Sequence, residues 1–438
     1  MFGKNTIYKI DFLLVAAVIL VVFLGILTIY SAGFDPIDKV NSGLYKKQLV
    51  WFIIGFMLML VFTFVNYKYL GDYSLYIYGF FLLVLIITTV FGSPIRNTRA
   101  WISFGFFSIQ PSEFMKLSLV LILGKYIEFR ERDIRNLREL FIPAILTMVP
   151  MLIIFIQPDF GTAVLFIPIL FTMLFVGGAD VTHLASIIGI AGIATVVPMV
   201  LTYREWIGAS GSNFLLNFFK DTDMLFIVSG ILILAALVTF ILNFFIPNKL
   251  FRKIYIPSTV LSFGLFFSVL LQKYLKVYQK RRILVFLNPD LDPHGSGYNV
   301  IQSKIAVGSG EFFGKGFLNG SQSQLGFLPE KTSDFVFSVF AEEWGFFGSV
   351  ILLALMGVII FRGIQIAFES KDKFGALLAS GIVAIFFFHL LINIGMVLGI
   401  MPVTGLPLPL MSYGGSNLAM SMIAVGILIN IRMRKFVY

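Results

Sequence analysis

Asp334 stands where the longest polar stretch of the chain, residues 272–335, meets the apolar run that begins at Phe335. A carboxylate at the mouth of a low-dielectric region has its charged form disfavoured, and this makes it a better general base. An Asp directly before a helix also caps the free N–H groups of the first turn. Position alone favours the capping role, and the two roles can coexist in one residue.

Other charged residues lie inside apolar runs, where they are costly and usually face a cavity or a partner. Glu342 and Glu343 follow Asp334 by about two turns in the same run. Glu113 and Lys116 are three residues apart, on one face of a helix, and can pair with each other. A structural ion pair is the default interpretation of this second set. The alternative is that these charges line a polar cavity beside the polar stretch.

Residues 272–335 also contain groups that suit an anion. Lys280, Arg281 and Arg282 form a cluster that could anchor to lipid head groups or hold a diphosphate. The glycine-rich run 308–316 could present backbone N–H groups to an anion, although such glycines more often permit turns. The run lacks the Walker pattern, so a nucleoside triphosphate is not expected.

Two proline-containing segments interrupt the apolar runs. Pro158 breaks one helix, and Asp159 is expected to cap the next. Residues 401–417, MPVTGLPLPLMSYGGSN, place non-helical backbone at membrane depth, where it must be buried in protein or line a polar cavity. The sequence suggests no metal site, because His183 and His389 have no nearby ligand partners and His294 lies in a turn.

The composition is that of a polytopic, all-α membrane protein. Hydrophobic residues make up 58% of the 438-residue chain and charged residues 13%, against a usual share of about 25% charged. The net charge of +10 is explained by basic residues at membrane surfaces rather than by nucleic acid. A membrane helix needs roughly 20 apolar residues. By that measure twelve spans are predicted, near residues 11–31, 48–66, 73–92, 112–128, 140–156, 160–178, 182–201, 224–246, 254–272, 336–361, 375–398 and 416–431.

Basic residues in the short connections predict the orientation. With the N-terminus inside, the inner connections hold sixteen Lys and Arg and the outer ones seven. Both termini are therefore expected in the cytoplasm and the loop 272–335 outside. A loop of this length is usually functional or disordered, and its apolar residues argue against disorder. Because nucleotides are scarce outside the cell, chemistry there needs a lipid-borne or secreted substrate.

A set of short motifs is spread over most of the chain: Arg99–Trp101, Gln110–Glu113 with Lys116, Gln157–Asp159 with Gly161 and Thr162, Phe286–Tyr298, Gln302–Gly310, Gly314–Gly316, Gly320–Asp334, Ala341–Gly345 and Pro402–Ser416. In these motifs and in their order the chain resembles the SEDS family (shape, elongation, division and sporulation proteins). The run SQSQLGFLPE, residues 321–330, is most similar to the elongation-specific members of that family.

The resemblance implies a peptidoglycan glycosyltransferase of the bacterial cytoplasmic (inner) membrane. Such proteins polymerise lipid II into glycan strands outside the membrane during cell elongation, with undecaprenyl diphosphate as leaving group. They act with a class B penicillin-binding protein, among other membrane proteins of the elongation complex. The family's essential Asp falls on Asp334, and a divalent cation, Mg²⁺ or Mn²⁺, is an open possibility.

The positions of charged residues and the family resemblance together predict further site residues. A set that would bind the substrate or its diphosphate comprises Lys280, Arg282, Lys315, Ser303, Lys304, Gln322 and Glu330. A set that would line a cavity or support the structure comprises Trp101, Glu113, Lys116, Glu342, Glu343 and Ser412.

The sequence departs from the family pattern in three places. Thr332-Ser333 stands where the family usually has His-Thr, and Glu311 stands where it commonly has Gly. Twelve spans are counted where the family usually has ten, within a single membrane domain of residues 1–438. Residues 203–272 are interpreted as an inserted pair of helices.

Two other functions stay open. A lipid II flippase should need a polar path through the spans and tolerate loss of Asp334, whereas a polymerase should not. A scaffold for the partner transpeptidase should depend on surfaces more than on any single carboxylate. Asp334, with a basic cluster in the same loop, favours the enzyme.

Overall fold

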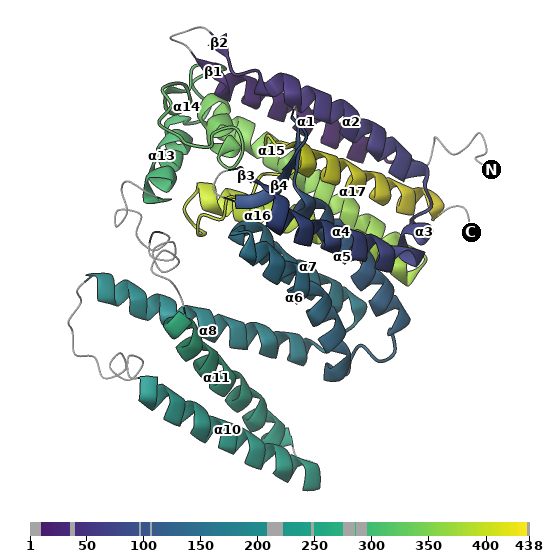
Figure 1. The fold of residues 1–438 in the computed structure, drawn as a ribbon, viewed down its shortest axis with the longest axis vertical. Coiled ribbons are helices and arrows are strands. Elements are labelled where there is room, and N and C mark those ends of the chain that lie inside the picture. Colours follow the sequence, from purple (N-terminus) through teal and green to yellow (C-terminus); the bar gives the residue numbers. More distant parts are fainter. Residues whose placement is uncertain are drawn as a thin grey trace. The chain divides into compact units, whose positions relative to one another are not determined.

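The computed structural model describes residues 10–35, 40–95, 98–105, 107–207, 222–246, 249–274, 285 and 296–435. Each of the twelve predicted spans coincides with a helix (Figure 1). These helices are α1 Phe12–Ala32, α2 Leu44–Phe64, α4 Ser74–Phe91, α5 Pro111–Phe129, α6 Phe141–Ile156, α7 Phe160–Gly177, α8 Val181–Ile207, α10 Thr222–Phe245, α11 Lys249–Tyr274, α15 Val336–Glu369, α16 Lys373–Val397 and α17 Gly415–Arg434.

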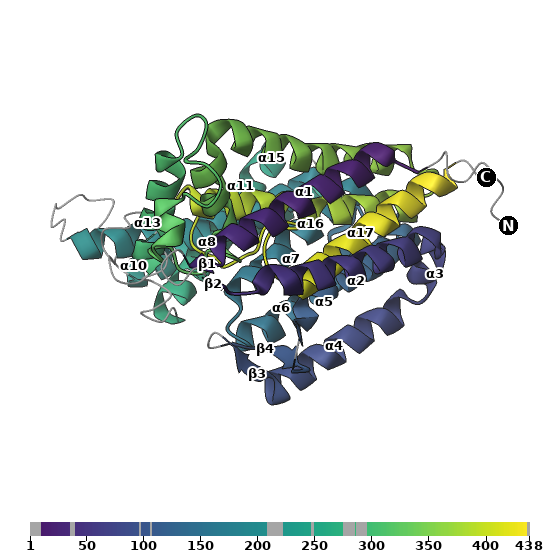
Figure 2. The same cartoon turned by 90° about the horizontal axis from the view of Figure 1, so that it is seen from above.

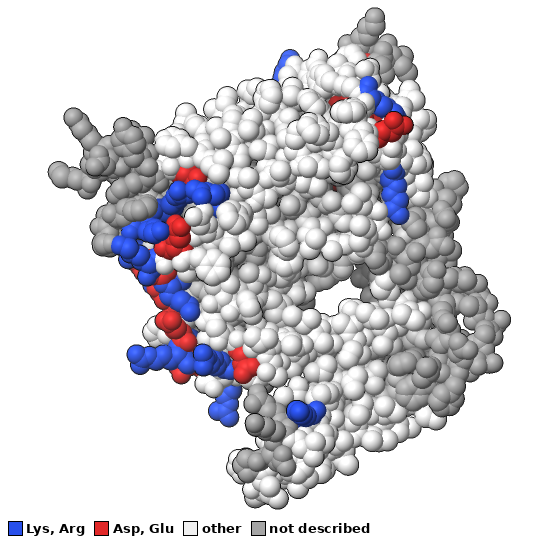
Figure 3. Space-filling view, turned by 180° about the vertical axis from the view of Figure 1, so that it is seen from behind, with Lys and Arg blue, Asp and Glu red and all other residues white. Residues whose placement is uncertain are grey.

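Eleven helices of the described chain are long and apolar enough to cross a membrane. The remaining predicted span, α5, contains charged residues at both ends: Glu113, Lys116, Lys125 and Glu128. On the face seen in Figure 3, most of the described surface carries no Lys, Arg, Asp or Glu. The protein is therefore an all-α polytopic membrane protein, as predicted.

Short elements complete the described chain. The helical ones are α3 Tyr67–Asp72, the 3₁₀ turn Leu137–Leu140, α13 Ser296–Ser309 and α14 Ser321–Gln324. Strands β1 Phe34–Asp35 and β2 Val40–Asn41 pair antiparallel, with Phe34 opposite Asn41. A second antiparallel sheet has the order β3 Ser93–Ile95, β4 Thr98–Ser103 and β5 Ser108–Ile109. Helices α13 and α14 lie within the predicted loop 272–335, so residues 296–335 of that loop are folded, whereas residues 275–284 and 286–295 lie outside the described residues.

The chain divides into two compact units. One contains residues 1–178 and 299–438, and the other contains residues 179–298. In the second unit α11 packs against both α8 and α10, around a core of Leu225, Leu265 and Val269. The assignment of residues 203–272 as an insertion stays a prediction.

Helix α17 is the centre of the first unit. It packs against α2, α5, α15 and α16, and Figure 2 shows it beside α2. In the most apolar stretch of α17, 94% of the residues are buried, although the mean hydropathy of 1.4 for this stretch is the lowest among the eleven helices. The reason is that α17 carries polar residues into the interior, among them Ser416, Asn417 and Asn430. The core of this unit is therefore partly polar, and those polar groups must find partners inside the protein.

A break in α15 shapes the same unit. Gly345 has φ 66° and ψ −163°, which interrupts the helical hydrogen-bond pattern. The carbonyls of Glu342 and Glu343 accept hydrogen bonds from the backbone N–H groups of Lys315 and Gly316, both at 3.0 Å. In return, the N–H groups of Phe346 and Phe347 donate to the carbonyls of Glu311 and Phe312, at 2.8 and 3.1 Å. Backbone groups freed by the break thus pair with the loop that follows α13.

Replacing Gly345 by Ala should destabilise the protein. A Cβ atom there would lie 2.3 Å from the backbone N of Gly314 and 2.8 Å from the carbonyl O of Phe312. A positive φ costs a non-glycine residue about 1–2 kcal/mol before this crowding is counted. The melting temperature in detergent should therefore fall clearly. The control is Gly357→Ala in the same helix, where a Cβ meets nothing within 4 Å. Equal melting temperatures for the two variants would contradict this account.

Candidate functional site

Asp334 lies in a tight turn, residues 330–335, directly before α15. The N-cap residue of α15 is Phe335, so the prediction that Asp334 occupies the cap position is wrong. The helix starts later than expected because of a local turn. In this turn the N–H groups of Ser333 and Phe335 both donate to the carbonyl of Glu330, at 3.2 and 3.3 Å. This turn delays the start of the helix by one residue. Asp334 itself is half-buried.

Three successive carbonyls of this turn are held by residues from distant parts of the chain. The backbone N–H of Tyr413 donates to the carbonyl of Thr332 at 2.9 Å. The Ser412 hydroxyl donates to the carbonyl of Ser333 at 2.6 Å. The Asn393 amide donates to the carbonyl of Asp334 at 2.9 Å. The backbone that carries the Asp334 carboxylate is therefore fixed residue by residue.

The proline-rich segment, residues 398–414, supplies two of these contacts and is non-helical. The prediction of non-helical backbone over residues 401–417 is therefore confirmed as far as residue 414 and is wrong for residues 415–417, which belong to α17. Its backbone is paired from inside the protein. The Leu408 N–H donates to the Ser412 hydroxyl at 2.8 Å, and the Gln48 amide donates to the Ser412 carbonyl at 3.1 Å. Gly405 borders Asp334 closely, because a Cβ added there would lie 3.2 Å from the Asp334 Oδ2 atom. The segment is thus a wall beside the carboxylate.

Helix α13 places a lysine at the same wall. The Ser303 hydroxyl donates to the carbonyl of Val397 at 2.8 Å and lies 2.8 Å from the Ser338 hydroxyl. This buried contact docks α13 on α15 and α16. The next residue, Lys304, is exposed and lies along Gly399, since a Cβ added to Gly399 would be 2.6 Å from the Lys304 Nζ atom. Lys304 and Asp334 therefore both border residues 399–405.

Glu342 organises the loop between α13 and α15. Its carboxylate is fully buried and accepts from the Lys315 ammonium at 2.9 Å and from the backbone N–H groups of Gln322 and Ser323, at 2.9 and 3.2 Å. The neighbouring Glu343 accepts a hydrogen bond from the Ser31 hydroxyl of α1. The two carboxylates face partners, as expected for charges at this depth. Lys315, predicted to bind diphosphate, is here the counter-ion of Glu342.

The glycine-rich run 308–316 serves this packing rather than presenting its amides to an anion. The N–H of Gly314 donates to the carbonyl of Gly310 at 2.8 Å, and the N–H groups of the next two residues bind the break in α15. Gly314 and Gly316 have φ values of 78° and 92°, which favour glycine. Of the two interpretations of this run, the structure supports the turn-forming one.

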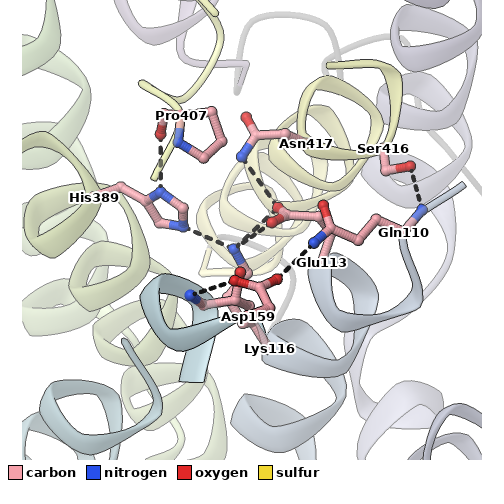
Figure 4. Close-up of polar contacts among 9 residues, drawn as sticks. Gln110, Glu113, Lys116, Asp159, His389, Pro407, Ser416 and Asn417 are labelled. Carbon is pink, nitrogen blue, oxygen red and sulfur yellow. Dashed lines mark hydrogen bonds and ion pairs between the residues drawn. The ribbon is translucent and has the colours of Figure 1, made fainter. Parts of the chain in front are cut away.

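A buried polar network lies between α5, α16 and α17 (Figure 4). The Lys116 ammonium donates to both carboxylate oxygens of Glu113, at 2.9 and 3.0 Å, which confirms the predicted ion pair. It also lies 2.7 Å from the Nε2 atom of His389. The Asn417 amide donates to Glu113 at 3.0 Å. Nothing in the sequence indicated this contact of His389, because its partner comes from a helix that is distant in sequence.

Asp159 extends this region at the start of α7. Its carboxylate accepts from the N–H of Thr162 at 3.1 Å, which confirms the predicted cap, and from the Gln110 amide at 2.8 Å. Figure 4 shows Asp159 beside the Glu113–Lys116 pair. Burial raises the pKa of the Asp159 carboxyl above its usual value.

The remaining predicted residues have varied positions. Trp101 lies half-buried in β4, opposite Ser93 of β3. Glu330 is exposed in the Asp334 turn. Lys280 and Arg282 lie outside the described residues. The roles predicted for individual residues stay predictions, but the structure gathers Asp334, Ser412, Ser303 and Lys304 around the end of α16.

Asn393 was missed by the sequence analysis. One feature of the sequence could have indicated it: Asn393 is a single amide within an apolar run. It follows His389 by four residues and so lies on the same face of the helix. Polar side chains at such positions usually have partners or functions. Among the described residues, no three His, Cys, Asp or Glu side chains gather in a way that could hold a metal ion.

Comparisons with known proteins agree with this architecture. A family model described as cell cycle protein, covering FtsW, RodA and SpoVE, matches residues 11–222 and 224–436. The peptidoglycan glycosyltransferase RodA of Treponema pallidum is 35% identical over 97% of this chain and 98% of that protein. The stage V sporulation protein E of Bacillus subtilis is 33% identical over 96% of both. A chain from a peptidoglycan synthase complex, solved to show how polymerization and crosslinking are coordinated, matches with TM-score 0.70, 29% identity and 98% coverage of each chain.

Replacing Lys116 by Met should strongly destabilise the protein. The Glu113 carboxylate would lose its cation while remaining buried, and breaking such a pair from one side costs about 3–5 kcal/mol. The control is Lys125→Met in the same helix. Lys125 is 43% exposed and pairs with Asp72 and Glu128, so its loss should cost about 0–1 kcal/mol.

Melting temperatures of the purified variants test this comparison. The double variant Lys116→Met, Glu113→Gln should recover part of the loss, because it removes the unpaired charge. Similar melting temperatures for Lys116→Met and Lys125→Met would show that the buried pair does not stabilise the fold.

Proposed function

The chain belongs to the FtsW, RodA and SpoVE family of cell cycle proteins and is a peptidoglycan glycosyltransferase, and we propose that it polymerises lipid II with Asp334 as general base. The observation that carries the proposal is the fixed turn around Asp334. Its three carbonyls are held by Asn393, Ser412 and Tyr413, and its carboxylate borders Gly405. A fixed backbone supports this role, because a general base must be held within hydrogen-bond reach of the proton that it accepts.

The reaction needs one acid–base centre. The 4-hydroxyl oxygen of the acceptor sugar attacks the anomeric carbon of the donor, and Asp334 accepts the hydroxyl proton. The new bond joins that oxygen to the anomeric carbon, while the bond from this carbon to the diphosphate oxygen breaks. Undecaprenyl diphosphate leaves with the electron pair and needs no proton from the enzyme. Glycosidases differ, because they use a pair of carboxylates.

Of the two predicted diphosphate-binding lysines that the structure describes, Lys304 and Lys315, Lys304 is the better placed to receive the diphosphate. It is exposed and borders the same segment as Asp334, and it makes no ion pair of 4.0 Å or less with a described residue. Lys315, in contrast, is already engaged by the buried Glu342. A positive charge near the leaving oxygens stabilises the charge that develops there.

A divalent cation would be held mainly by the substrate. The described residues offer no cluster of three metal-binding side chains. Mg²⁺ is commonly bound by one or two carboxylates together with substrate phosphates. Asp334 and the diphosphate of lipid II would suit Mg²⁺ or Mn²⁺ in this way, and the ion would add charge neutralisation at the leaving group.

The distribution of Lys and Arg supports an orientation with both termini in the cytoplasm and Asp334 on the outer face. There it would meet lipid II whose sugars are already outside. The likeness to a chain of a synthase complex supports a class B penicillin-binding protein as the partner that crosslinks the product.

The flippase alternative draws on the buried charges of α5. Lys116 is 0% exposed and Glu113 1% exposed. Both are enclosed by partners, and Lys116 uses its donors on Glu113 and His389. Charges arranged in this way pair with one another inside the protein rather than line an open path for a polar head group, and this favours the polymerase.

Asp334→Asn should lower glycan-strand formation from labelled lipid II by about 10²- to 10⁴-fold, because the base is lost while the shape of the side chain is kept. The assay uses purified protein, alone and with the cognate class B penicillin-binding protein. The control is Asp372→Asn, since Asp372 caps α16 and Asn also serves as an N-cap. Wild-type polymer from a folded Asp334→Asn variant would remove Asp334 from the chemistry.

Lys304→Met should reduce polymerisation with intact folding, because an exposed lysine contributes little to stability. Lys304→Arg retains the positive charge and should restore most of the rate. Steady-state kinetics with varied lipid II separates the two variants. Equal rates for Met and Arg at this position would show that the charge of Lys304 does not act on the diphosphate.

A further inference from the structure

We propose that Asn393 of α16 is a positioning residue for Asp334, holding the Asp334 turn and the proline-rich segment at a fixed separation. The inference rests on the proposed function, since it assigns Asn393 a kinetic role through Asp334. A single amide nitrogen makes both contacts. It donates to the carbonyl of Asp334 at 2.9 Å and to the carbonyl of Leu406 at 2.7 Å.

The orientation of this amide is fixed by its surroundings. Asn393 is 0% exposed, and its NH₂ group has two donors, both of which face carbonyl oxygens. Rotating the amide by 180° would bring its oxygen against the same two carbonyl oxygens. The Oδ1 atom is buried and has no hydrogen-bond partner among the described residues. The side chain therefore acts as a double donor.

The two carbonyls belong to the two sides of the candidate site. One is that of Asp334 itself. The other is that of Leu406, the residue after Gly405, which borders the Asp334 carboxylate. Asn393 consequently sets the distance between the base and the wall that faces it. A shift of about 1 Å in such a distance can cost a hundredfold in rate.

His389 supplies a second anchor one turn earlier on the same face of α16. Lys116 has only donors, so the Nε2 atom of His389, 2.7 Å away, accepts. The Nδ1 atom of the neutral ring then carries the proton and donates to the carbonyl of Pro407 at 3.1 Å, as drawn in Figure 4. The carbonyls of Leu406 and Pro407 are thus both held by α16. The Lys116–Glu113 pair holds the His389 ring from the other side. The proline-rich segment beside Asp334 is therefore held in place by buried contacts.

The test compares two buried asparagines whose amides each bridge backbone carbonyls. Asn430 of α17 is 1% exposed, and its amide donates to the carbonyls of Phe62, Thr63 and Val65, at 3.1, 2.7 and 2.5 Å. Its oxygen also accepts from the N–H of Tyr67 and from Arg434, at 3.4 and 3.0 Å, so its loss should affect folding at least as much as loss of Asn393. Asn393→Leu and Asn430→Leu each remove an amide that bridges backbone carbonyls. Asn393→Gln keeps the donor on a side chain one methylene longer, and it serves if Asn393→Leu does not fold. Melting temperature, kcat per folded protein and KM for lipid II are measured for each, with the class B penicillin-binding protein present.

The proposal expects kcat and kcat/KM to fall equally, by about tenfold or more, in the Asn393 variants, because the interaction matters in the transition state. Asn430→Leu should lower the melting temperature and keep the wild-type kcat per folded protein. Wild-type kcat in a folded Asn393 variant overturns the proposal, as does an equal loss of kcat in Asn430→Leu. If Asp334→Asn is inactive while the Asn393 variants are normal, this inference alone fails. If Asp334→Asn is fully active, both the role of Asn393 and the role of Asp334 as base are wrong.

Discussion

Backbone groups inside this bundle must be paired by the protein itself. The structure depends on how this requirement is met at two places, the break in α15 at Gly345 and the non-helical segment between α16 and α17. In hydrocarbon an unpaired N–H or C=O costs several kcal/mol, so non-helical backbone survives only where partners surround it. At Gly345 the partners are the backbone groups of residues 311–316. In the proline-rich segment they include Asn393, Ser412 and Gln48. At each place, these hydrogen bonds join a non-helical segment to a long helix.

Buried charges follow the same logic. Glu113 is neutralised by Lys116, and Glu342 by Lys315, with further hydrogen bonds to the carboxylate in each case. A buried pair does not by itself add much stability, because desolvation offsets its attraction. Its effect is to fix geometry: one pair supports His389 behind the proline-rich segment, and the other holds the loop that leads into the Asp334 turn. These four charged side chains therefore have partners within the protein.

The sequence predicted the helices well because each span is a long apolar run, and it predicted the Glu113–Lys116 pair and the Asp159 cap because both are local. Asp334 was predicted as the base from its position at the end of the polar loop and from the family resemblance, and this role stays a prediction. The contacts of Asn393 and His389 could not be predicted, since their partners are carbonyls and a lysine far away in the sequence. The capping of α15 by Asp334 was wrongly expected because the turn at Glu330 moves the helix start by one residue. Lys315 could not be separated from Lys304 by sequence, because burial of Glu342 decides which lysine is already paired.

The central claim is that the Asp334 carboxylate, which borders Gly405, accepts the proton of the acceptor 4-hydroxyl. It is tested most directly by a structure of the protein with an unreactive lipid II donor and a glycan acceptor bound. The account predicts the acceptor 4-hydroxyl within hydrogen-bond reach of Asp334, about 2.6–3.2 Å, with the diphosphate beside Lys304. A hydroxyl placed against another carboxylate such as Glu330, with Asp334 out of reach, would contradict it.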